Sequence, residues 1–162
     1  MQNLKDKLNW CLAKGKRMKA IPPNIQLSKE HIEKAKHNLK AADYNMQGGF
    51  DDWAVSQAYY AMYHSLLAIL FRKGFESKNH ECTINVIEYL IEMKQIDFGR
   101  EDLMFIRATE QMTGKDAKSL REEFQYGTET KVNKMILQNL IHKSKEIVEK
   151  VDDLKYFFVI EG

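Results

Sequence analysis

The stretch WAVSQAYYAMYHSLLAILF, residues 53–71, decides the fold of this chain. It is too long for a single strand and contains no Gly or Pro, so it predicts a helix. At about 100° per residue, its apolar side chains fall on two different faces of that helix. A helix that is apolar on nearly every side has to be covered on more than one side. We therefore expect a central helix that packs on its own domain and, on the second face, on another chain or a ligand.

Helices are also expected through the rest of the chain, because apolar residues recur at steps of three and four and no segment reads as a strand. Ser28 is placed to cap the helix before the central one, Asp51 to cap the central helix, and Gly74 to end it. The expected helices cover residues 3–14, 29–47, 52–73, 79–94, 100–112, 116–126 and 131–154.

These helices predict an all-α fold, an antiparallel, up-and-down helical bundle with short extra helices. We expect residues 1–26 to form a short N-terminal helix and a basic linker, residues 27–155 the bundle, and residues 156–162 a C-terminal tail. The final helix should turn one apolar face inward. That face comprises Val132, Met135, Ile136, Leu140, Ile147, Val148, Val151 and Leu154.

The composition is typical of a globular protein in a reducing compartment. Apolar residues make up 44% of the 162 residues and charged residues 30%, as in one ordinary soluble domain. Cys11 and Cys82 are too few for a disulfide framework, and charges interrupt the N-terminus where a signal peptide needs an apolar run. We expect a cytoplasmic protein without a membrane span, because polar side chains interrupt the central helix and charges flank it.

Charge is balanced over the whole chain but unevenly distributed. The 25 Lys and Arg residues stand against 23 Asp and Glu, a balance that does not by itself indicate a nucleic-acid binder. Lys14, Lys16, Arg17 and Lys19 nevertheless form a basic cluster near the N-terminus. Such a cluster is either a solvated linker or a phosphate-binding patch.

No metal site and no cofactor are predicted. The chain contains no Cys-x-x-Cys, no His-Glu-x-x-His and no paired Glu-x-x-His. His80 and Cys82 are two residues apart, so on a helix they point about 200° away from each other.

Three polar groups stand out against the apolar background. The first is Gln57, Tyr60 and His64, at spacings of i, i+3 and i+7 on one helix face. Amide, phenol and imidazole together can bind a nucleobase or relay a proton. The alternative is a buried or interface cluster whose hydrogen bonds are satisfied internally.

The second group is residues 77–80, Ser-Lys-Asn-His, just before an expected helix. Free backbone N–H groups beside Lys78 and His80 would suit an anion, whereas the alternative is a simple helix cap.

The third group is Arg121, Glu122 and Tyr126. A guanidinium can clamp a phosphate with two hydrogen bonds, whereas the alternative is an Arg paired with a carboxylate at a helix end.

The order of these motifs resembles the HEPN domain proteins, whose name stands for higher eukaryotes and prokaryotes nucleotide-binding. The resemblance runs from about residue 27 to 151. It rests on residues 52–55 (Asp-Trp-Ala-Val), 58–64 (Ala-Tyr-Tyr-Ala-Met-Tyr-His), 73–74 with 77–80, 120–122 (Leu-Arg-Glu) and 126–127 (Tyr-Gly).

The resemblance implies an antiparallel helical bundle, usually a homodimer, often encoded beside a minimal nucleotidyltransferase as a toxin–antitoxin pair. Many members are metal-independent ribonucleases in which an Arg and a His four to six residues later form a composite cleft between two copies. Arg121 matches the arginine and Glu122 the polar position after it, but Tyr126 stands where the His is expected. Thr128 stands where some members carry a tyrosine that is adenylylated.

Three functions follow as hypotheses. The first is a HEPN module that binds a nucleotide or RNA phosphate and associates with a nucleotidyltransferase. Its predicted binding residues are Arg121, Glu122, Tyr60, Gln57, Lys78 and His80. The second is an endoribonuclease that uses Arg121, Tyr126 and His64. The third is a structural homodimer. Its predicted interface is Trp53, Tyr60, Leu67 and Phe71.

Overall fold

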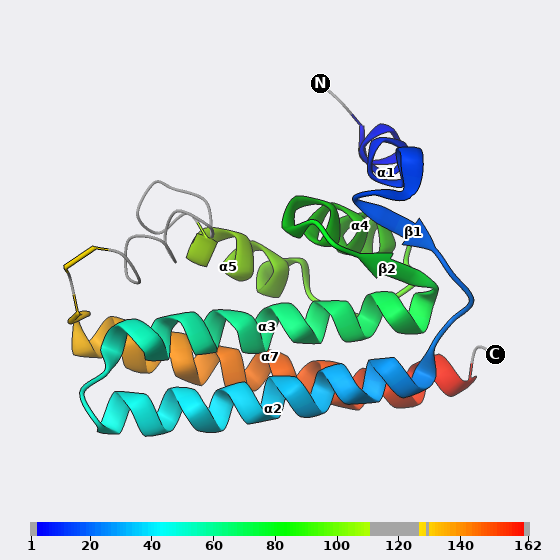
Figure 1. Ribbon diagram of the computed structural model, residues 1–162. Helices are drawn as coiled ribbons and strands as arrows, with labels where there is room; N and C mark the ends of the chain where they lie inside the picture. The colour runs from blue at the N-terminus through cyan, green and yellow to red at the C-terminus, as the bar shows by residue number, and fades with distance from the viewer. Residues whose placement is uncertain (1–2, 111–126, 129, 161–162) are drawn as a thin grey trace.

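The computed structural model describes residues 3–110, 127–128 and 130–160, and these are predominantly helical (Figure 1). In chain order its elements are α1 (Leu4–Leu12), η1 (Ala13–Gly15), β1 (Met18–Ala20), α2 (Ile25–Gln47), α3 (Asp51–Lys73), β2 (Phe75–Ser77), α4 (His80–Glu92), α5 (Arg100–Glu110) and α7 (Lys134–Ile160). The all-α prediction is confirmed. The helix expected over residues 116–126 lies outside the described residues.

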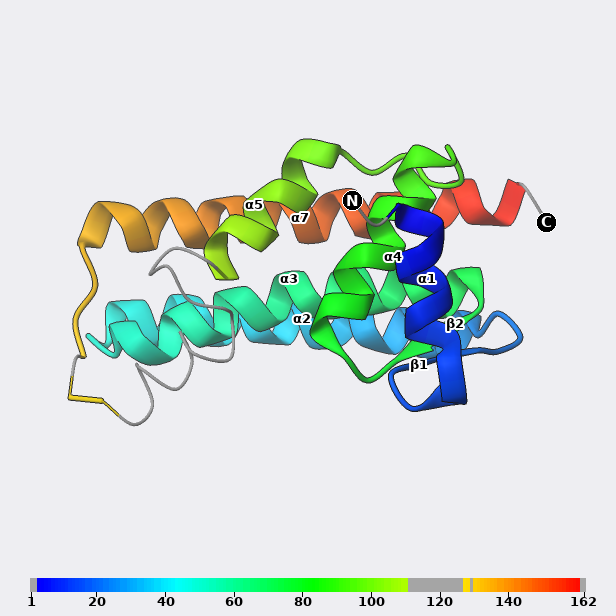
Figure 2. The same cartoon turned by 90° about the horizontal axis from the view of Figure 1, so that it is seen from above.

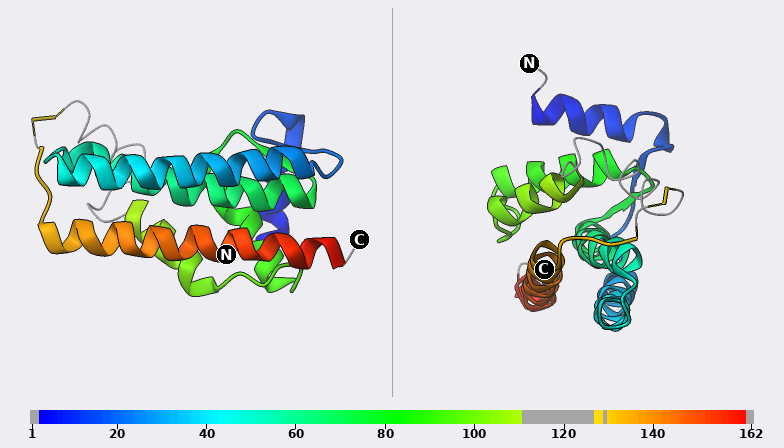
Figure 3. Two further views of the ribbon diagram at one scale, coloured as in Figure 1. Left: turned by 90° about the horizontal axis from the view of Figure 1, so that it is seen from below. Right: turned by 90° about the vertical axis from the view of Figure 1, so that its left-hand side faces the viewer.

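The three long helices pack against one another as a bundle, and the shorter helices lie on the α3 side of it. Helices α2, α3 and α7 lie side by side, with α4 and α5 across α3 and α1 beyond α4 (Figures 1 and 3). Helix α7 runs in the same direction as α3, because α5 returns the chain between them (Figure 2). Helices α2 and α3 are antiparallel, as predicted, whereas the next long helix, α7, runs parallel to α3, so the antiparallel prediction was wrong for that pair.

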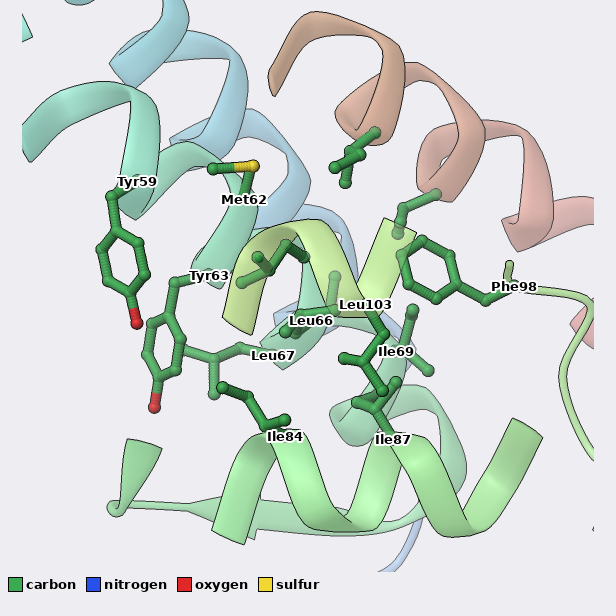
Figure 4. Close-up of a cluster of buried hydrophobic side chains, with 14 of the residues drawn as sticks. Tyr59, Met62, Tyr63, Leu66, Leu67, Ile69, Ile84, Ile87, Phe98 and Leu103 are labelled. Carbon is green, nitrogen blue, oxygen red and sulfur yellow. The ribbon is translucent and has the colours of Figure 1, made fainter. Parts of the chain in front are cut away.

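The core is built around α3. Met62, Leu66 and Ile69 of this helix meet Ile84 of α4 and Leu103 of α5, and all five side chains are buried (Figure 4). From the other side α2 and α7 cover the helix, so α3 is buried on several sides as its sequence predicts.

The inward face of α7 is shifted from the predicted one. Met135 and Ile136 are 71% and 44% exposed, whereas Leu137 and Ile141 are buried. The prediction was wrong for the first two residues. Met135 falls on the opposite side of the helix from Leu140, whereas Ile136 lies at the edge of the buried face and in the first turn of α7, at the end of the bundle.

The N-terminal segment contains two features that the sequence analysis did not predict. Residues 18–20 form β1, which pairs antiparallel with β2 in the register Met18↔Ser77. Cys11 of α1 and Cys82 of α4 form a disulfide across 71 positions of sequence. The expectation of unpaired cysteines was therefore wrong, and so was the expectation of no strand. Both contacts join distant segments, which local periodicity does not reveal.

Helix ends agree with the prediction at two positions and differ at two. Gly74 ends α3 with a φ of 90°, and Asn79 begins α4 by accepting the Cys82 N–H at 2.9 Å. The cap of α2 is Asn24, not Ser28, whose hydroxyl is buried and donates to the Ala68 carbonyl at 2.8 Å. Asp51 is the first residue of α3 rather than its cap. Its carboxylate instead accepts the Val132 N–H at 3.2 Å.

Ion pairs join α7 to its neighbours. The carboxylate of Asp102 on α5 is buried and lies 2.9 Å from both Lys143 and Lys150 of α7. Burial raises the pKa of Asp102, but hydrogen bonds and charge from the two lysines outweigh that effect and hold the pKa below its ordinary value. Within the described residues, no helix combines the length and apolar character needed to cross a membrane.

We expect Gly74→Ala to destabilise the protein by about 2–4 kcal/mol. A left-handed backbone strains any residue with a Cβ, and here the Cβ would lie 2.7 Å from the Ile21 carbonyl oxygen. Gly49→Ala is the matched control, because Gly49 also has a positive φ, 84°, but nothing lies within 4 Å of its Cβ position. Gly49→Ala should lower the free energy of unfolding by only about 1 kcal/mol. Urea unfolding would measure both, and equal losses would contradict the predicted clash.

Candidate functional site

One stripe of α3 is less buried than the rest of the helix, and every residue in it is polar. Between Ala54 and Arg72, four side chains are only partly buried, and all others are buried. They are Ser56, Gln57, Tyr60 and His64, here called the polar stripe. Their spacing puts them on one side of the helix, in line with exposed Trp53. The structure thus places the predicted triad on one accessible stripe.

Helix α2 supplies partners to both ends of the polar stripe. Gln57 Oε1 accepts a hydrogen bond from Asn45 Nδ2 at 2.7 Å. His64 Nδ1 lies 2.9 Å from His31 Nδ1. These contacts correspond to the alternative of internally satisfied side chains, yet they leave Gln57 and His64 partly accessible to a ligand. Tyr60 lies between them and meets the ring of Tyr59 edge-on.

The histidine pair is neutral near pH 7. A hydrogen bond between two Nδ1 atoms requires one ring to donate and the other to accept. Burial lowers the pKa of His31 despite the charge of Glu30. Burial, then the charges of His31 and Lys34, lower the pKa of His64 to about 4. His64 is therefore a hydrogen-bonding group rather than a proton carrier at neutral pH.

A second cluster lies on the α4 side of α3. The imidazole of His80 stacks on Tyr63, with ring centroids 4.1 Å apart, and its Nδ1 is 3.0 Å from the hydroxyl of Tyr59. The hydroxyl of Tyr63 is 3.1 Å from that of Thr83. Both tyrosines are buried, whereas His80 remains exposed on its outer side. The stack is thus anchored in the core and open to solvent at one ring.

Residues 77–80 form a helix cap, which was the alternative to an anion site. Asn79 Oδ1 accepts the Cys82 N–H at 2.9 Å, and the hydroxyl of Ser77 accepts the Asn79 N–H at 3.3 Å. The backbone N–H of Lys78 donates to the Arg17 carbonyl at 2.8 Å. Several donors expected to bind an anion are therefore used internally, while the Lys78 side chain is exposed.

The third predicted group lies outside the described residues, namely Arg121, Glu122 and Tyr126. The described chain ends at residue 110 of α5 and resumes at Gly127. A hydrogen bond from the Val132 N–H to the Asp51 carboxylate then attaches the resumed chain to the first turn of α3. Gln57 lies near this end of α3. Thr128 is exposed.

Of the four residues predicted to form the dimer interface, two are buried within the chain and two are accessible. Leu67 and Phe71 are only 8% and 7% exposed, and Phe71 stacks on His31. The chain itself therefore covers these two residues, so they do not need a second chain. Trp53 is 49% exposed and Tyr60 partly exposed. Association through this end of α3 stays a prediction.

Within the described residues, no group of three or more His, Cys, Asp or Glu side chains is arranged to hold a metal ion. Four residues of these clusters were not predicted as site residues: His31, Tyr59, Tyr63 and Thr83. The two tyrosines lie at i and i+4 on the apolar face, and the need of a buried phenol for a hydrogen-bond partner was the available signal. For His31 no local signal exists, because its partner lies on another helix.

Comparison with known proteins agrees with this fold and motif order. The family model described as HEPN domain matches residues 28–154, so the chain belongs to the HEPN domain family. It is 30% identical over 119 residues to a UPF0332 protein of Archaeoglobus fulgidus, covering 74% of this chain and 87% of that protein. It is 26% identical over 120 residues to a protein of Methanocaldococcus jannaschii named "Putative toxin", covering 74% and 75% respectively.

We expect acid to destabilise the fold through His64. Unfolded, this imidazole takes up a proton near pH 6.5, whereas in the fold it does so only near pH 4, so stability is lost as the pH falls between these values. The full shift would correspond to about 3 kcal/mol, and partial exposure reduces that to roughly 1–2 kcal/mol. Urea unfolding at each pH would measure it.

His64→Gln should flatten this part of the pH profile. His37→Gln is the control, because it removes an exposed histidine of α2 that does not contact His64. Identical slopes in wild type and His64→Gln would contradict the assignment.

Proposed function

We propose that this chain is a HEPN module that binds RNA or a nucleotide through phosphate and base contacts, and that it acts beside a nucleotidyltransferase in a toxin–antitoxin-like pair. The observation that carries the proposal is the polar stripe. An otherwise buried helix leaves one accessible side, and there it presents an amide, a phenol and an imidazole. These groups can hydrogen-bond and stack on a nucleobase.

Arg121 supplies the phosphate contact in this proposal. A guanidinium binds phosphate with two parallel hydrogen bonds, and Glu122 accompanies it in the family motif. The tie between Val132 and Asp51 supports a joint role, because it brings the chain that follows the motif to the same end of α3 as Gln57. Lys78 and His80 would extend the contact surface on the α4 side.

Binding is favoured over cleavage by the state of His64. Ribonuclease chemistry needs a proton carrier whose pKa is near neutral pH. The pKa of His64 is about 4, and a tyrosine side chain in water titrates near 10. His64 is therefore poorly suited to the task, and a tyrosine without a pKa shift is a weak base at neutral pH. The second candidate function is a metal-independent endoribonuclease using Arg121, Tyr126 and His64, which the name of the M. jannaschii relative favours.

We expect Arg121→Ala to weaken binding of a single-stranded RNA about 10- to 100-fold, because each charge-assisted hydrogen bond contributes roughly 1.5–3 kcal/mol. Arg121→Lys is the matched control, which keeps the charge but loses the paired geometry and should recover only part of the affinity. Fluorescence anisotropy would measure both. Equal affinity of wild type and Arg121→Ala would contradict the proposed phosphate contact.

The same proteins, incubated with structured RNA in EDTA, test the second candidate. Cleavage by wild type that disappears in both Arg121→Ala and Tyr126→Phe would establish the ribonuclease instead of a pure binding module. Cleavage that persists in Arg121→Ala would come from a contaminating nuclease.

The homodimer is the third part of the proposal. Trp53→Glu should convert a dimer to a monomer with unchanged helix content, because it places a charge in an interface without touching the core. Tyr44→Glu is the control, since Tyr44 is 76% exposed on α2. Leu67→Glu would instead unfold the chain. Sedimentation of wild type as a monomer would remove this part of the proposal.

A further inference from the structure

The positive charge of the chain is concentrated in the segment before the family domain. Residues 1–24 contain six Lys and Arg residues and one acidic residue, Asp6, a net charge of +5. The whole chain has a net charge of +2, so the remaining residues carry −3. The HEPN family model begins only at residue 28. The basic character therefore belongs to an N-terminal extension of this chain.

The fold gathers this charge into one patch together with a lysine from the family domain. Strand β1 pairs with β2, and the Lys78 N–H donates to the Arg17 carbonyl at 2.8 Å. Arg17 and Lys78 are therefore neighbours at the end of this strand pair. Met18 faces the core, which turns Lys19 outward. We call this patch the basic ribbon. It comprises Lys14, Lys16, Arg17, Lys19 and Lys78.

The turn before β1 folds back over the same patch. Residues 14 and 15 both have positive φ, 66° and 63°, which reverses the chain after α1. The Cγ of Lys19 lies 3.7 Å from the point where a Cβ on Gly15 would stand, so the lysine side chain passes over this turn. All four lysines of the basic ribbon are exposed, and Arg17 is partly exposed. In the pairing of β1 with β2, Lys19 stands opposite an acidic residue, Glu76.

An aromatic ring lies beside these cations. The guanidinium of Arg17 is 3.9 Å from the ring centroid of Trp10, and its Nη1 donates to the Trp10 carbonyl at 3.3 Å. Trp10 is 42% exposed. A stacked guanidinium and an accessible indole next to lysines is the combination that binds single-stranded nucleic acid, with phosphates on the cations and bases on the planar groups.

The patch is held rigidly to the bundle. The disulfide between Cys11 and Cys82 attaches α1 to α4, and backbone hydrogen bonds between the strands attach β1 to β2. Beyond β1, the Ile21 N–H donates to the Gly74 carbonyl at 2.9 Å. A pre-ordered surface loses less conformational entropy on binding than a free basic tail.

We propose that the basic ribbon binds the phosphate backbone of single-stranded RNA, with a base packed on Trp10. The choice of RNA rests on the proposed function and on position. Lys78 belongs to the basic ribbon, and two residues later His80 begins the stack on Tyr59 and Tyr63. The basic ribbon thus extends a nucleic-acid surface from the family domain onto the N-terminal extension.

The test is the salt dependence of binding to a fluorescein-labelled, unstructured 20-nucleotide RNA, between 50 and 200 mM salt, with the full chain in its disulfide form. We expect Lys14→Ala/Lys16→Ala/Lys19→Ala to weaken binding more than 10-fold at the lowest salt and to reduce the slope of log K against log salt by about 2, since each lost phosphate contact removes ~0.7. Thermal unfolding would verify that the triple variant is folded.

The control variant is Lys29→Ala/Lys40→Ala/Lys134→Ala, which removes the same charge at exposed positions elsewhere. It should change the affinity less than 3-fold. Equal losses in the two triple variants would overturn the proposal, because they would show a general charge effect. A second readout uses Trp53→Phe, which leaves Trp10 as the single tryptophan. RNA should quench its fluorescence, and unchanged emission at saturating RNA would also count against the proposal.

The outcomes separate this proposal from the proposed function. Binding that is lost in Arg121→Ala but intact in the basic-ribbon variant would overturn the inference about the basic ribbon alone. Absence of RNA binding by wild type would overturn both. Vesicles containing phosphatidylserine are the alternative polyanion, and binding to them that depends on the three lysines, with RNA binding unaffected, would assign the patch to a membrane surface and overturn the RNA proposal.

Discussion

The burial of α3 on every side but one is the constraint on which the rest of the structure depends. Apolar side chains around nearly the whole circumference need covering layers, and α2, α7 and the α4–α5 pair provide them (Figure 4). Polar groups on such a helix must find partners within the fold. Ser65 bonds to the Ala61 carbonyl, Tyr63 meets Thr83, and His64 meets His31.

These partners set the chemistry that the polar groups can perform. An imidazole in water would titrate close to neutral pH, but the same group packed beside a second imidazole has a lowered pKa and keeps its lone pair for hydrogen bonding. Because the neighbour comes from α2, a change in α2 packing would alter the chemistry of α3. The packing of α2 against α3 thus sets the protonation of His64.

The local parts of the fold were predictable and the pairings between distant segments were not. Residues 53–71 reveal a helix through their length and composition. Gly74 marks a helix end because glycine readily adopts a positive φ, and Asn79 marks one because its side chain can cap a helix. By contrast, Asn24 and Ser28 are equally good caps by type, and only the burial of Ser28 against Ala68 decides between them. For the site, the polar stripe was predictable from its spacing, but the partners His31 and Asn45 depend on how α2 packs.

The disulfide and the β-ribbon are the clearest case of this limit, and they also change how the N-terminal extension relates to the family domain. A basic segment before a domain reads as a solvated linker unless something fixes it. Here its attachments reach Gly74, residues 75–77 and Cys82, which span the junction from the end of α3 to the first turn of α4. The ring of His80 stacks in that same junction. Because both depend on the same short stretch of backbone, the N-terminal extension and the aromatic stack form one structural unit.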